Sequence, residues 1–95
     1  MTRRAKDCII RIVGSPDPRV KTPYDGRYVV RWNPHTKAGL LDLTTTANIA
    51  KATRFSFETA MEEWRTISQV EKVRPWDGQP NRPLTAVTIE VLRQA

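Results

Sequence analysis

The placement of proline most constrains how this 95-residue chain can fold. Six of the seven prolines lie in two segments, 14–26 and 71–83. Proline has no backbone N–H to donate and fixes φ, so neither segment can continue as an interior strand or as a helix. Regular structure is therefore expected outside these two segments, which are predicted to be long loops.

Short runs with β-branched residues or alternating apolar and polar residues predict four strands. Their ranges are Cys8–Val13, Tyr28–Trp32, Leu40–Thr44 and Leu84–Leu92. In the second run, alternation places Tyr28, Val30 and Trp32 on one face and Val29 on the other. The short connection between the second and third runs favours an antiparallel hairpin.

One segment has the periodicity of an amphipathic helix. Its apolar stripe consists of Phe57, Ala60, Met61, Trp64 and Ile67. Ser56 is a suitable N-cap, and Pro75 prevents the helix from extending far beyond Val70. Phe57 and Trp64 are predicted to be core residues, because they lie on the stripe.

The order of these elements predicts an α+β fold over residues 1–95, taken as one small domain. A small antiparallel or mixed sheet of about four strands carries the amphipathic helix on one face, in the order β-β-β-α-β. Residues 45–55 are expected to form one short helical turn followed by a brief extended piece. Residues 1–6 are expected to be a flexible basic arm.

The positive charge is unevenly distributed. Residues 1–37 contain nine Lys or Arg against three Asp, which gives +6, whereas residues 38–95 contain seven basic and seven acidic residues, which gives zero. Such asymmetry favours an anionic partner, either nucleic acid or an acidic protein surface. A solvated basic face that aids solubility would give the same pattern.

A proline–aromatic–Asp–Gly sequence occurs at 23–26 and again at 75–78. Proline presets φ, Asp can accept hydrogen bonds from nearby backbone, and Gly permits positive φ, so both copies are predicted to be tight turns. No wider similarity surrounds the two copies, which argues against an internal repeat. The alternative is a binding element that is used twice.

Both proline-containing loops hold arginines beside aromatic residues, the composition of interaction hot spots and of base-stacking surfaces. Arg74, Trp76 and Arg82 are predicted to anchor a partner. Further candidates for contact are Lys21, Tyr24, Arg27 and Arg31.

No catalytic or metal-binding pattern is present. Cys8 is the only cysteine and is expected to be a buried, unreactive thiol, while His35 is expected to lie in a solvated turn. We therefore expect no enzymatic activity, no catalytic residues, no metal and no cofactor. No apolar run is long enough to cross a bilayer or to form a signal sequence, so we expect no membrane association and a cytoplasmic location.

The segment Thr44–Trp64, together with Asp77-Gly78 and residues 80–85 (Pro-Asn-Arg-Pro-Leu-Thr), resembles small bacteriophage- and prophage-encoded proteins of unassigned function. The resemblance covers the C-terminal half and carries no site residues. It implies a bacterial host cell, where small phage proteins often inhibit or adapt host machinery, including defence systems.

Two functional hypotheses follow. The first is a non-enzymatic protein-binding module that modulates or inhibits a host protein or a protein–nucleic acid complex. The alternative is a small basic protein that binds nucleic acid directly. A homodimer is also open, because an edge strand within Leu84–Leu92 could pair with a second copy.

Overall fold

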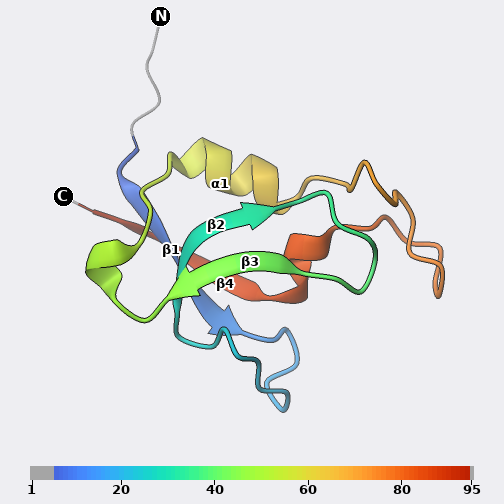
Figure 1. Ribbon diagram of the computed structural model, residues 1–95, viewed down its shortest axis with the longest axis horizontal. Coiled ribbons are helices and arrows are strands. Elements are labelled where there is room, and N and C mark those ends of the chain that lie inside the picture. Colours follow the sequence, from blue (N-terminus) through green and yellow to red (C-terminus); the bar gives the residue numbers. More distant parts are fainter. Residues whose placement is uncertain (1–5, 95) are drawn as a thin grey trace, which may run out of the picture.

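The computed structural model describes residues 6–94 of the chain. Its strands are β1 (Cys8–Gly14), β2 (Tyr28–Asn33), β3 (Asp42–Thr46) and β4 (Thr88–Arg93), and its helix is α1 (Phe57–Trp64). Two 3₁₀ turns, η1 (Ile49–Lys51) and η2 (Pro83–Ala86), complete the regular structure (Figure 1). Of the basic N-terminal segment expected at residues 1–6, only Lys6 lies within the described residues.

The four strands form one antiparallel sheet in the order β3-β2-β1-β4. β2 and β3 pair as the predicted hairpin, and β4 returns along the other side of β1. The predicted fold class, α+β with the order β-β-β-α-β, is confirmed. Within residues 6–94 no helix is long and apolar enough to cross a membrane.

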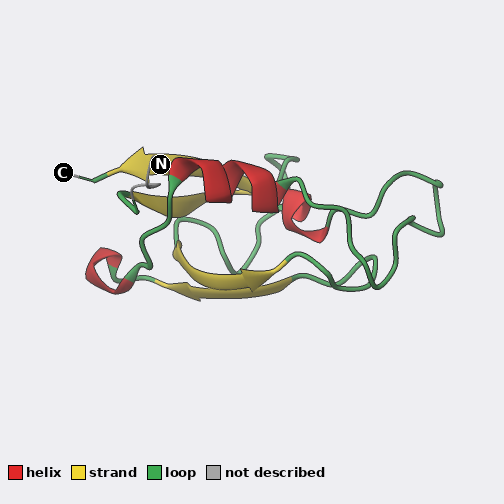
Figure 2. Cartoon of the chain, turned by 90° about the horizontal axis from the view of Figure 1, so that it is seen from above, coloured by secondary structure: helices red, strands yellow, loops and turns green. Residues whose placement is uncertain are grey.

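The sheet is strongly bent between β1 and β2, which meet in register at Arg11 and Tyr28. Figure 2 shows β1 and β4 in one layer and β2 and β3 in a second layer, with the helix beside them. Side chains from both layers and from α1 fill one core. Its buried members are Ile10, Ile12, Val29, Leu43, Ala60, Trp64, Leu84 and Val87.

A β-bulge in β2 overturns the predicted faces of that strand. The register with β3 shifts between Val29 and Arg31, so that Val30 is an additional residue. Val29 is fully buried, and Trp32 also packs against the core, three residues later. Because a bulge resets the alternation, Val29 and Trp32 lie on the same side and not on opposite sides as a regular strand requires.

The helix begins as predicted but ends earlier. The Ser56 hydroxyl accepts the Thr59 N–H, which caps the first turn, and the last helical residue is Trp64. Ile67 therefore lies outside the helix. Phe57 is 44% exposed, so its prediction as a core residue was wrong, whereas Trp64 is 6% exposed and was predicted correctly.

The remaining differences concern element boundaries. Strand β3 begins two residues later than the alternation indicated, at Asp42. The start of the last predicted strand is instead η2, which buries Leu84. Between 45 and 55, η1 and the isolated bridge from Phe55 to Cys8 match the expected helical turn and extended piece.

The contrast between Trp64 and Phe57 gives a test of this packing. Trp64→Ala is expected to lower the free energy of unfolding by about 3–5 kcal/mol, because it removes a buried ring that also contacts Trp32 edge to face. Phe57→Ala should lower it by only about 1 kcal/mol, since much of that ring is already in water. Urea unfolding followed by circular dichroism measures both, and equal losses would contradict the assigned core.

Candidate functional site

The second proline-containing segment has no helix or strand before η2, as predicted, but it is internally hydrogen-bonded. Val73 and Pro80 form an isolated antiparallel bridge, and the Arg74 N–H donates to the Gln79 carbonyl at 2.8 Å. Residues 68–82 thereby form a narrow two-sided projection, which we call the arm. Figures 1 and 2 both show it, in orange in Figure 1, extending beyond the sheet and the helix.

The base of the arm is fixed by buried polar side chains. Asn81 is 2% exposed, and its Nδ2 donates to the carbonyls of Thr36, at 3.0 Å, and Glu71, at 2.7 Å. The hydroxyl of the fully buried Ser68 donates to the same Thr36 carbonyl at 2.8 Å. These bonds tie both sides of the arm to each other and to the β2–β3 connection, so its position is well defined.

The tip of the arm is the Pro-Trp-Asp-Gly turn. The Arg74 guanidinium forms an ion pair with the Asp77 carboxylate at 2.6 Å, and its Cζ lies 5.8 Å from the centre of the Trp76 ring. The Gly78 N–H donates to the Arg74 carbonyl, with φ of +69° at Gly78. Trp76 itself is 61% exposed, which is unusual for so large an apolar side chain.

The Pro-Tyr-Asp-Gly copy is also a turn, but its hydrogen bonds differ. The Asp25 carboxylate accepts from the hydroxyl and N–H of Thr22, whereas the Asp77 carboxylate accepts from the Arg74 guanidinium and the Gln79 N–H. Gly26 also has positive φ, +74°. Tyr24, however, is half-buried and packs against the core. Both copies of the sequence are thus turns, but the aromatic ring is largely exposed to solvent only in the second copy.

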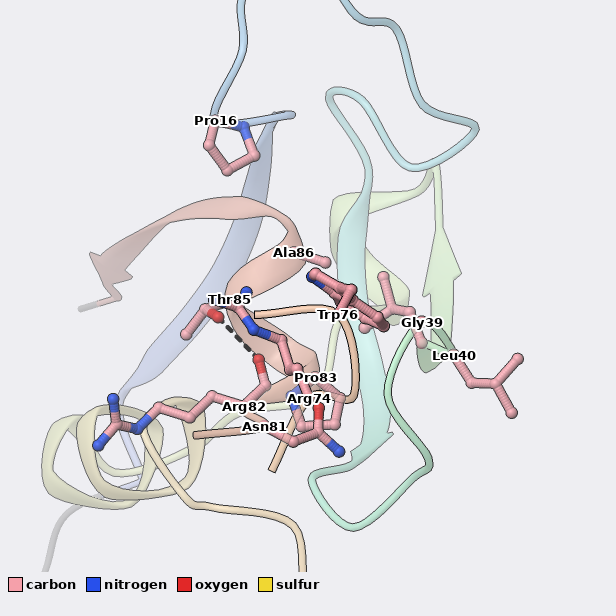
Figure 3. A pocket seen from close by; sticks show the side chains of 11 residues that line it. Pro16, Gly39, Leu40, Arg74, Trp76, Asn81, Arg82, Pro83, Thr85 and Ala86 are labelled. Carbon is pink, nitrogen blue, oxygen red and sulfur yellow. Dashed lines mark hydrogen bonds between the residues drawn. The ribbon is translucent and has the colours of Figure 1, made fainter. Parts of the chain in front are cut away.

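A hollow of about 330 Å³ lies between the arm, the β2–β3 connection and η2. It is lined by Pro16, Gly39, Leu40, Leu41, Arg74, Trp76, Asn81, Arg82, Pro83, Thr85 and Ala86. Figure 3 shows the Trp76 ring between Ala86 and Gly39, with the Leu40 side chain extending away from the ring. All three predicted anchors, Arg74, Trp76 and Arg82, therefore lie around a single cavity.

Arg82 also has a structural contact. Its Nε donates to the carbonyl of Arg65, just beyond α1, at 3.0 Å. In Figure 3 its side chain extends away from Trp76, and the dashed line marks the bond from the Thr85 hydroxyl to the Arg82 carbonyl. Its two terminal nitrogens form no hydrogen bond or ion pair with another residue in the described part of the chain.

The other predicted contact residues lie apart from this cavity. Lys21 is exposed beside a second hollow, of about 270 Å³, in the first proline-containing loop. Arg27 donates to the Thr45 hydroxyl at 2.8 Å, and Arg31 donates to the Thr44 hydroxyl at 3.3 Å. Arg27 and Arg31 thus each form a hydrogen bond to strand β3, and both lie apart from the arm.

Sequence reasoning missed the place of Leu40 beside the hollow and the structural role of Asn81. Leu40 is 59% exposed and lines the hollow, although it was expected to start a strand. Its position directly after Gly39, which has φ of +86°, was the available signal of a turn. Asn81 stands in a polar loop sequence typical of recognition, yet its side chain is buried and holds the arm in place.

The residues with catalytic potential do not converge on this cavity. Cys8 is 1% exposed, and burial raises the pKa of its thiol, so the reactive thiolate is disfavoured. His35 lies at the base of the arm, where its Nδ1 accepts the Gln69 N–H at 3.3 Å. Among residues 6–94, no group of three or more His, Cys, Asp or Glu side chains is arranged to hold a metal ion.

The chain matches no protein-family model, no curated protein and no solved structure. Its function is therefore inferred from the cavity and the arm themselves.

The bonds of Asn81 give a direct test of how the arm is held. Asn81→Ala should lower the free energy of unfolding by about 2–3 kcal/mol, because the carbonyls of Thr36 and Glu71 lose a buried donor. It should also speed hydrogen exchange at the arm amides. Gln79→Ala is the matched control, with an expected change below about 0.5 kcal/mol, because that side chain is exposed. Equal effects of the two substitutions would show that Asn81 does not hold the arm.

Proposed function

We propose that this protein is a non-enzymatic protein-binding module whose binding element is the arm. The observation that carries the proposal is Trp76, which is 61% exposed at the end of a projection fixed at its base. Tryptophan and arginine are the residues most enriched in the energetic centres of protein interfaces. A Trp76 ring left in water has no role in the core and is available to a partner.

The order within the arm supports binding with little loss of entropy. The bridge between Val73 and Pro80 and the Arg74–Asp77 ion pair restrict the tip before any partner arrives. A preorganised loop binds more tightly than a mobile one, because less conformational freedom is lost.

Further exposed apolar side chains lie on the arm and directly before it. Ile67, Val70 and Val73 precede Trp76 at intervals of three residues, and each is at least 36% exposed. Leu40, in the β2–β3 connection, is a further exposed apolar residue. This amount of exposed apolar surface around one segment favours a protein partner over a small soluble ligand.

The partner that we propose is a host protein or a host protein–nucleic acid complex in a bacterial cell. The setting comes from the bacteriophage proteins that the C-terminal half resembles, and the net charge of +6 suits an acidic surface. Modulation or inhibition of that complex is the corresponding activity.

Direct nucleic-acid binding is supported less well. Arg74 is paired with Asp77, and Arg27 and Arg31, which donate to threonines of β3, lie apart from the exposed Trp76 ring. A nucleic-acid surface needs a run of unpaired cations beside exposed rings. Strong binding to single-stranded oligonucleotides at low salt, unchanged by Trp76→Ser, would favour this alternative.

Affinity capture from a bacterial lysate tests the proposal. Wild-type protein should retain a partner in a fixed stoichiometry, and Trp76→Ser should reduce the recovered partner at least about tenfold, as expected for an aromatic hot spot. Val20→Ser is the matched control, because Val20 is also exposed but lies in the other loop. Retention that is the same for all three proteins, or no retained protein, would refute binding through the arm.

A further inference from the structure

The segments around the hollow beside Trp76 are joined by hydrogen bonds. Asn81 joins the arm to the β2–β3 connection through the Thr36 carbonyl, and the Ala38 N–H donates to the Glu71 carboxylate at 2.7 Å. The walls on either side of the hollow therefore keep their separation. A partner would meet a cavity that already exists.

The lining combines apolar residues with two arginines. Leu40, Leu41, Pro83 and Ala86 supply aliphatic surface, and Trp76 supplies an aromatic face. A volume of about 330 Å³ lies at the lower end of the range for ligand pockets, so the hollow suits a large apolar side chain better than an extended cofactor.

The charge of the lining determines which partner residues can flank that side chain. The lining residues include two arginines and no carboxylate. The charge of Arg74 is balanced by Asp77, but Arg82 uses only its Nε, in a bond to the Arg65 carbonyl. Its terminal nitrogens remain directed into solvent, where an incoming carboxylate can bind both of them.

We propose that the hollow receives one large apolar side chain from an acidic segment of the partner protein, and that a carboxylate next to this side chain binds Arg82. This inference rests on the proposed function and adds the chemistry of the segment that is recognised. Trp76 contacts the apolar side chain, while Arg82 distinguishes acidic from neutral or basic neighbours.

Selection from a random dodecapeptide library displayed on phage tests the proposal and does not require the partner to be identified. Peptides retained by the wild-type protein should share Leu, Ile, Phe or Trp flanked by Asp or Glu. Affinities of the synthetic peptides should fall at least about tenfold for Trp76→Ala, as is typical of an interface hot spot. Absence of enrichment, or an enriched motif that lacks acidic residues, overturns the proposal.

The role of Arg82 is tested by a substitution that removes its positive charge, with a matched control. Arg82→Gln should lower the affinity for an acidic peptide about three- to tenfold. This loss should vanish for the same peptide with amides in place of its carboxylates. Arg31→Gln, also an exposed arginine bonded through Nε, should change affinity less than about twofold. Thermal unfolding of both variants checks that each is folded, and equal effects of the two overturn the assignment to Arg82.

The two proposals fail in different ways. If lysate capture still depends on Trp76 but the library yields no acidic motif, the arm binds a protein and the acidic apolar segment is wrong. If the library yields the motif but lysate capture is unaffected by Trp76→Ser, the cavity has the inferred chemistry and the proposed function is wrong.

Discussion

The hydrogen bonds of the Asn81 side chain are the constraint on which the candidate site depends. One amide group joins the Thr36 and Glu71 carbonyls, and Ser68 reinforces the Thr36 contact. The arm contributes little to the hydrophobic core, so burial of apolar surface does not determine where it lies. A buried donor without its acceptors is costly, and this cost, not packing, selects one position for the arm.

The residues that stabilise the fold are therefore separate from those of the proposed binding site. Both strand layers and α1 place their apolar residues in one core, with Trp64 and Trp32 in edge-to-face contact. The arm instead exposes apolar residues, of which Trp76 is the largest. Substitutions at the tip should then alter binding without altering folding, which is the condition under which a small domain can change partners while keeping its scaffold.

The local patterns of the sequence were enough to predict the sheet, the hairpin and the helix start, because alternation, turn residues and the Ser56 cap act over a few residues. What they could not predict depends on distant contacts. The helix ends before Ile67, where the chain turns into the arm and the Ser68 N–H donates to the Asn81 backbone carbonyl. Likewise, the two turns with the same sequence pattern differ in that Tyr24 reaches the core and Trp76 does not, which only the surrounding fold decides.

The central claim is that the arm is rigid in the absence of a partner. Amide ¹⁵N relaxation of the free protein in solution measures this most directly, at the hydrogen-bonded amides of Arg74, Gly78 and Asn81. We predict order parameters of about 0.8 or more, equal to those of β1. Values below about 0.6 at these amides, with β1 remaining ordered, would show a mobile arm and contradict the account.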